Sequence, residues 1–110
     1  MDRMNEYRQL LEQVLRDHPA HPPGRPVETR LVVDRERDDY LLLDVGWGEK
    51  GRVHCLFAHL RLRDGKVWIE KDGTERGFAV ELVEAGIPKE DIVLAFYRPQ
   101  QRKLTDYAVA

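Results

Sequence analysis

The first part of the chain has apolar residues at the spacing of one helical face. They recur every three or four positions, with further apolar residues beside them: Met4, Tyr7, Leu10, Leu11, Val14 and Leu15. Charged residues such as Glu12 fall on the opposite side, which we expect to face water. The pattern predicts a helix over residues 5–17 with Asn5 as its N-cap. The proline-rich residues 18–26 cannot continue the helix and predict a solvated loop.

Apolar and polar residues then alternate, which predicts β-strands. Four such segments follow one another along the chain: residues 27–34, 40–47, 52–63 and 66–71. Polar turns separate them, and Asp64-Gly65 is a strong hairpin signal. Because short connections favour antiparallel neighbours, we expect a four-stranded antiparallel meander. In the third strand, alternation predicts that four apolar residues share one face: Leu56, Ala58, Leu60 and Leu62.

The spacing returns to that of a helix after residue 73. Thr74 predicts the N-cap of a helix that reaches Ala85, and Gly86 is placed to end it in the left-handed conformation. The apolar residues 92–97 predict a short buried strand, and residues 98–110 form a tail without a clear period. We therefore expect an α+β fold that uses all 110 residues as a single domain, with both helices on one face of the sheet.

Composition narrows the class of protein. The chain has 42% apolar and 35% charged residues, which is too apolar for a disordered chain. No apolar run approaches the roughly 20 residues that a membrane span needs. Cys55 is the single cysteine and cannot form an internal disulfide, and the N-terminus shows no secretory signal, so we expect a cytoplasmic protein. The 18 basic and 20 acidic residues give a net charge of −2, which disfavours binding to DNA by charge alone.

Histidine and cysteine spacing predicts neither a metal site nor a cofactor. His54 and Cys55 are adjacent, so their side chains point to opposite faces of a strand. Cys55 and His59 share a face but lie about 13 Å apart, too far for a thiol and its base. His18 and His21 lie among prolines without an acidic or thiol partner, and zinc needs three or four convergent ligands.

Two groups of residues are candidates for contact with a partner. Trp47 and Trp68 lie at or near strand edges, and tryptophan is enriched at interfaces. The second group combines basic and aromatic residues of the tail: Tyr97, Arg98, Arg102, Lys103 and Tyr107. Residues 52–58 are apolar on both faces, so we expect one face to pack on the helices and the other on a second copy, which predicts a homo-oligomer.

Several stretches of the chain resemble the XisI family, the fdxN element excision controlling factors. The stretches are residues 64–69, 72–75, 81–96 and 105–109, together with the helix around residues 7–8 and the strand 40–47. Tyr97 departs from the family pattern, which commonly has histidine, and residues 18–26 differ from the usual connection. The resemblance implies a cyanobacterial-type protein that is required for excising a DNA element during heterocyst differentiation, a DNA rearrangement, without being the recombinase. It also implies a partner, an XisH-like protein.

Three function classes follow from these observations. The leading hypothesis is a non-enzymatic accessory factor that acts through contact with an XisH-like partner and touches nucleic acid only indirectly or weakly. The alternative is a direct DNA-binding regulatory module with a basic face of Arg61, Arg63, Arg98, Arg102 and Lys103. The third is an enzyme that uses Asp72 and Glu75, with a divalent ion. A turn followed by a helix cap is the more ordinary role for these two carboxylates.

Overall fold

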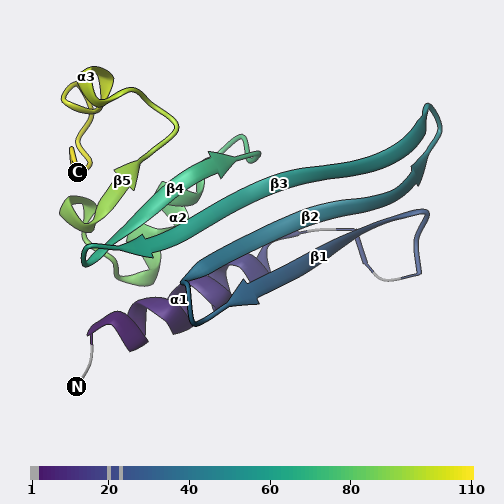
Figure 1. The fold of residues 1–110 in the computed structure, drawn as a ribbon, viewed down its shortest axis with the longest axis horizontal. Helices are drawn as coiled ribbons and strands as arrows, with labels where there is room; N and C mark the ends of the chain where they lie inside the picture. Colours follow the sequence, from purple (N-terminus) through teal and green to yellow (C-terminus); the bar gives the residue numbers. More distant parts are fainter. Residues whose placement is uncertain (1–2, 20, 23) are drawn as a thin grey trace.

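Five strands form one sheet, in the order in which they occur along the chain (Figure 1). The computed structural model describes residues 3–19, 21–22 and 24–110. Four consecutive strands pair antiparallel with one another: β1 (Val27–Asp34), β2 (Asp39–Gly48), β3 (Gly51–Arg63) and β4 (Lys66–Asp72). The fifth, β5 (Ile92–Leu94), pairs parallel with β4. The α+β class is confirmed, and β1 to β4 form an antiparallel meander, but this meander is not the whole sheet, because β5 joins it and makes the sheet five-stranded and mixed.

The parallel strand follows from the connection that precedes it. Adjacent parallel strands need a long crossover between them, usually a helix. Here α2 (Phe78–Ala85) and the short 3-10 helix η1 (Lys89–Asp91) supply it. β5 is shorter than predicted, because the chain leaves the sheet after the Ala95 N–H donates to the Ile69 carbonyl at 2.9 Å. Phe96 and Tyr97 therefore lie outside the strand.

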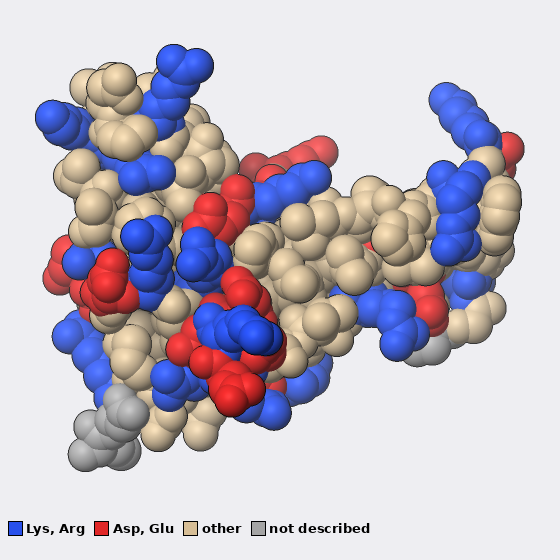
Figure 2. Space-filling model, in the orientation of Figure 1, with Lys and Arg blue, Asp and Glu red and all other residues tan. Residues whose placement is uncertain are grey.

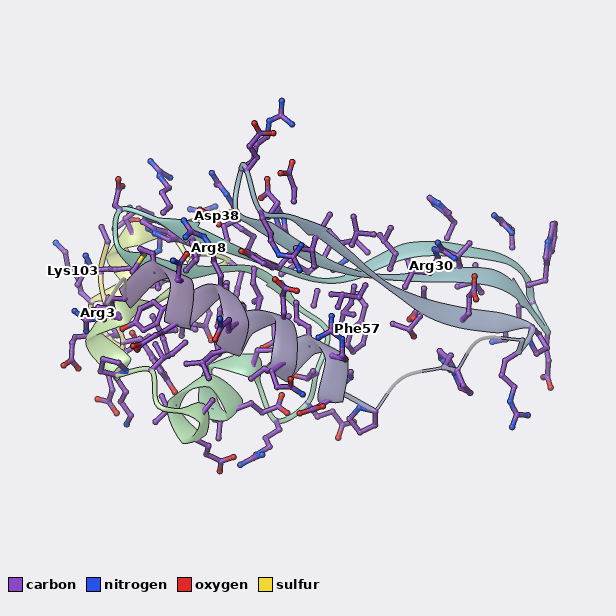
Figure 3. All side chains as sticks on the ribbon, turned by 90° about the horizontal axis from the view of Figure 1, so that it is seen from below. Arg3, Arg8, Arg30, Asp38, Phe57 and Lys103 are labelled. Carbon is purple, nitrogen blue, oxygen red and sulfur yellow. The ribbon has the colours of Figure 1, made fainter. Side chains whose placement is uncertain are left out.

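The two longer helices cover the same face of the sheet, as predicted. α1 (Arg3–Asp17) and α2 lie below the sheet in Figure 3, where Phe57 points toward them and Arg30 points away. Between them and the strands lies the core, whose largest fully buried side chains include Leu11, Leu15, Tyr40, Leu60, Ile69, Phe78 and Leu82. No helix in the described parts of the chain is long and apolar enough to cross a membrane.

The polar side of α1 differs from the prediction in two places. The helix begins at Arg3, so Asn5 is inside it rather than at its cap, and the Asn5 side-chain oxygen accepts a hydrogen bond from Arg8. Glu12 does not face water but is 9% exposed. The guanidinium of Arg35 donates to both of its carboxylate oxygens, at 2.8 and 2.9 Å. Arg35 belongs to the β1–β2 turn, where charged side chains gather (Figure 2).

The start of α2 is organised by Asp72 instead of Thr74, which the sequence predicts as the cap. The helix begins at Phe78, whose N–H donates to Asp72 Oδ2 at 2.7 Å. The Thr74 N–H donates to Asp72 Oδ1 at 2.9 Å, and the Thr74 hydroxyl accepts from the Gly77 N–H. One carboxylate thus holds the whole connection from β4 to α2. The end of the helix is confirmed, since Gly86 is left-handed with φ 116°.

A bulge in β3 changes which side chains reach the core. Leu42 pairs with Ala58, whereas Leu43 pairs with Leu56, so Phe57 is an extra residue opposite β2. Because side chains alternate along a strand, this extra residue moves Leu56 to the face opposite Ala58. The prediction that Leu56 shares a face with Ala58, Leu60 and Leu62 is therefore wrong. Those three are buried, and Leu56 lies half-buried on the other face.

The Asp72 network predicts a stability difference between two neighbouring carboxylates. We expect Asp72→Ala to lower the free energy of unfolding by about 1–2 kcal/mol, because it removes the acceptors of the first turn of α2. Glu75→Ala is the matched control, since Glu75 is exposed, and we expect a change within about 0.5 kcal/mol. Urea denaturation followed by circular dichroism measures both variants. Equal losses would contradict the capping role.

Candidate interaction surfaces

The predicted contact residues lie at opposite ends of the molecule. Trp47 is at the far end of β2, next to the turn into β3. The tail and its short helix α3 (Pro99–Arg102) lie at the other end of the sheet, beside β4 and β5 (Figure 1). The structure therefore separates these residues into two surfaces, and it adds exposed apolar residues to each.

Arg102 fastens the tail to the body of the protein. Its guanidinium donates to the carbonyl of Tyr97 at 3.0 Å and to that of Ala95 at 3.1 Å. The same group lies 5.6 Å from the ring centre of Trp68. Further along, the Ala108 N–H donates to the Ile92 carbonyl at 2.8 Å. These contacts fold the tail over β4 and β5.

Trp68 of β4 and Tyr107 of the tail itself help to hold the tail against the sheet. Trp68 is 8% exposed, its indole N–H donates to the Arg63 carbonyl at 2.9 Å, and the Arg63 guanidinium lies 4.9 Å from the ring centre. Tyr107 is half-buried against the core, with the Lys89 ammonium 5.9 Å from its ring centre. Both residues hold the tail in position and are not themselves open to a large partner.

The exposed part of this region defines the tail surface, formed by Phe96, Tyr97, Arg98, Lys103 and Leu104. The exposed fractions of Phe96, Tyr97 and Leu104 are 48%, 41% and 87%. The Phe96 and Tyr97 rings are in contact, with centres 4.8 Å apart. The sequence does not single out Phe96, which lies in a segment with the pattern of a buried strand, or Leu104, because the tail has no period. Figure 2 shows uncharged side chains flanked by Lys and Arg at this end.

The second surface lies on the hairpin of β2 and β3, which together with β1 extends beyond the helices as an arm (Figure 1). Five apolar side chains of the arm face away from α1, and we call them the arm face: Val32, Leu41, Leu43, Val45 and Leu56. Val32 is 39% exposed and the other four are half-buried. Trp47 follows at the tip, 63% exposed, with the Arg52 guanidinium 5.5 Å from its ring centre.

The opposite face of the arm carries polar side chains in its middle. Thr29 and Asp44 lie there side by side, with the Thr29 hydroxyl 2.6 Å from Asp44 Oδ1, and Cys55 is exposed as a free thiol next to them. A hollow of about 340 Å³ opens at this place, where α1 ends. His18, predicted to be solvated, instead packs its ring against Phe57, with the ring centres 5.3 Å apart.

The groups expected to do chemistry are used for structure. Both oxygens of Asp72 accept hydrogen bonds from the connection to α2. Among the described residues, no group of three or more His, Cys, Asp or Glu side chains converges to hold a metal ion.

Near the start of α1, the Tyr7 hydroxyl donates to Asp91, and Arg3 donates to the same carboxylate at 2.6 Å. Burial, followed by the hydrogen bond to Asp91, raises the pKa of Tyr7.

The basic residues predicted for DNA binding are dispersed. Arg61 lies 3.6 Å from Asp39 and 3.3 Å from Glu70, and Arg63 lies 3.6 Å from Asp64. Arg102 fastens the tail, as described above. Arg98 and Lys103 are exposed, and both belong to the tail surface. The structure thus leaves two cations beside two aromatic rings instead of a continuous basic face.

The sequence model of the family described as "XisI protein" matches residues 1–109. The chain belongs to the XisI family. The resemblance noted in the sequence is therefore confirmed, over nearly the whole chain.

Two solved structures from Anabaena variabilis ATCC 29413 are similar to this XisI-family chain. One is described as fdxN element excision controlling factor XisI and is 38% identical, with a TM-score of 0.83, over 99% of this chain and 100% of that chain. The other is described as an XisI-like protein and is 36% identical, with a TM-score of 0.77, over 96% of this chain and 94% of that chain. No match was found among curated proteins. The arm and the tail both lie within the span shared with the first structure.

The role of Arg102 predicts how the tail responds to mutation. We expect Arg102→Ala to speed amide hydrogen exchange at Ala108 about tenfold, because hydrogen bonds to a charged group contribute roughly 1.5–3 kcal/mol. Lys103→Ala removes an adjacent exposed cation and serves as the control, with exchange expected to stay within about twofold. Hydrogen exchange measured by NMR compares the two variants. Unchanged exchange in Arg102→Ala would contradict the fastening role.

Proposed function

We propose that this protein is a controlling factor for the excision of a DNA element, and that it acts by binding another protein and not as a catalyst. The observation that carries the proposal is the similarity, over 99% of the chain, to the structure described as fdxN element excision controlling factor XisI. The family match over residues 1–109 supports the same role. The partner that we propose is an XisH-like protein.

The tail surface supports a role in binding a protein. Phe96 and Tyr97 place two aromatic rings in contact on the outside of the molecule, and exposed aromatic residues dominate the energetics of many interfaces. Arg98 and Lys103 flank them with positive charge. A complementary partner surface has an apolar recess bordered by carboxylates. Arg102 holds the rings in place before binding, which lowers the entropy lost on association.

The role of Asp72 supports a function without catalysis. This carboxylate was the strongest candidate for acid–base chemistry in the sequence. Its oxygens accept hydrogen bonds from the backbone at 2.7 and 2.9 Å, so it is occupied in holding α2. Glu75 is exposed.

Direct binding to DNA is the alternative function. The observation that favours it is the exposed pair Arg98 and Lys103 next to the ring of Tyr97, since cations and stacked rings together bind single strands. Against it stands the net charge of −2, together with the engagement of Arg61 and Arg63 in ion pairs. If only two cations contact the DNA, its affinity decreases by only a small power of the salt concentration.

The tail surface predicts where the partner binds. We expect the protein to co-purify with an XisH-like protein at tens of micromolar. We expect the double variant Phe96→Ser, Tyr97→Ser to weaken the complex at least tenfold, because central aromatic residues each contribute roughly 2 kcal/mol or more. Isothermal titration calorimetry with the purified partner measures the dissociation constants.

Val80→Ser is the control for this experiment, because Val80 is also an exposed apolar residue, 37% exposed, but lies on α2. Its dissociation constant should match that of the unchanged protein. No complex at tens of micromolar would refute the proposed partner. A gel shift with single- and double-stranded DNA at low salt tests the alternative, and a shift abolished by Lys103→Glu would favour DNA binding.

A further inference from the structure

The arm carries its apolar side chains on the face that no helix covers. Near α1, the side chains that point to the helices are apolar, as Tyr40 and Leu42 are. Farther along the same face of the arm, past the contact of His18 with Phe57, polar side chains such as Thr29 and Asp44 appear among them. On the arm face, the central column of β2 is apolar, with Leu41, Leu43 and Val45, and charged or polar side chains such as Glu28 and His54 lie at its margins. When one face of an antiparallel sheet is exposed to water, the apolar face is the one that packs against another layer of protein.

Figure 2 shows how the arm face lies in the isolated chain. The uncharged side chains form a continuous surface along β2 and β3, between the charged β1–β2 turn and the basic tip of the arm. The tail and α3 fold over β4 and β5, and therefore leave this surface open. An open apolar surface of this kind marks an interaction site.

We propose that the arm face binds the arm face of a second copy of this chain, which gives a symmetric dimer. The two sheets pack face to face, about 10 Å apart, with the apolar column of Leu41, Leu43 and Val45 at the centre of the contact. This inference concerns a surface at the other end of the molecule from the tail surface, and it does not depend on the proposed partner or function.

The charges at the two margins of the arm face favour a second copy as the occupant. The β1 margin carries Glu28 and Asp34 together with Arg30, which lies 3.2 Å from Glu28, and is acidic by one charge. Through β2, the register places Glu28 level with His54, and Asp34 level with Arg61, both on the β3 margin. A two-fold axis parallel to the strands puts the β1 margin of one copy over the β3 margin of the other. The acidic margin of one copy then faces the more basic margin of the other twice in the dimer, with Glu28 level with His54, and Asp34 level with Arg61, which also contacts Asp39 and Glu70 of its own chain.

The size of the arm face predicts the strength of the dimer. β2 has 10 residues, which gives a face about 34 Å long, and three strands give a width of about 14 Å. Two such faces bury about 1,000 Å² in total, which is the lower limit for a specific interface. We therefore expect a dimer that dissociates in the micromolar range.

Sedimentation velocity from about 1 to 100 µM tests the dimer in the full chain. The expected result is a shift from monomer to dimer across this range. Leu43→Lys and Val45→Lys each place a charge in the apolar column and should weaken dimerisation at least tenfold. Val80→Lys, on α2, is the control and should leave the dimer unchanged. A monomer throughout the range would overturn the inference, as would equal effects of Leu43→Lys and Val80→Lys.

Reversal of the margin charges tests the arrangement of the two copies. Glu28→Lys places a cation against His54 of the second copy, and His54→Glu places a carboxylate against Glu28. Each variant should weaken the dimer about two- to fivefold, as exposed ion pairs do. The double variant restores opposite charges and should recover the original dissociation constant. A double variant as weak as both single variants combined would overturn the side-by-side arrangement of the margins.

Discussion

A difference in length between the helices and the strands determines how this molecule is built. α1 has 15 residues and β3 has 13, which correspond to about 22 Å of helix and about 44 Å of strand. One helix of this length covers only the part of the sheet near the β1–β2 turn, and α2 adds 8 residues at the same end. The core therefore gathers at one end, and the remaining strand length becomes the arm.

Charged side chains that bond within the chain hold the parts that the core does not reach. Asp72 fixes the connection to α2, Arg102 fastens the tail, and Glu12 holds the β1–β2 turn through Arg35. Each of these charged groups is already hydrogen-bonded within the chain. Composition alone therefore overstates the charge available to a ligand, and the tail surface and the arm face are apolar at their centres with charged side chains at their margins.

Local periodicity predicted most of the fold, because spacing depends on which face of a helix or strand is buried. It located β1 to β4 and the end of α2 at Gly86. It could not predict the bulge at Phe57, since an extra residue leaves the alternation of types on either side intact and appears only in the pairing with β2. It also missed the parallel pairing of β5 and the capping by Asp72, which depend on contacts between distant residues. The tail surface was half predicted: Tyr97, Arg98 and Lys103 are exposed, while Trp68 is inside.

The Phe57 bulge restricts how the length of β3 can change during evolution. Solvent-exposed hairpins usually tolerate insertions and deletions. Here the loss of Arg52, with the pairing to β2 kept continuous, would remove the extra position at Phe57 and move residues 53–57 by one place. His54 and Leu56 would then exchange faces with Val53 and Cys55. We expect natural length variation in the arm to fall in the turn at residues 48–51, where the register of both faces is preserved.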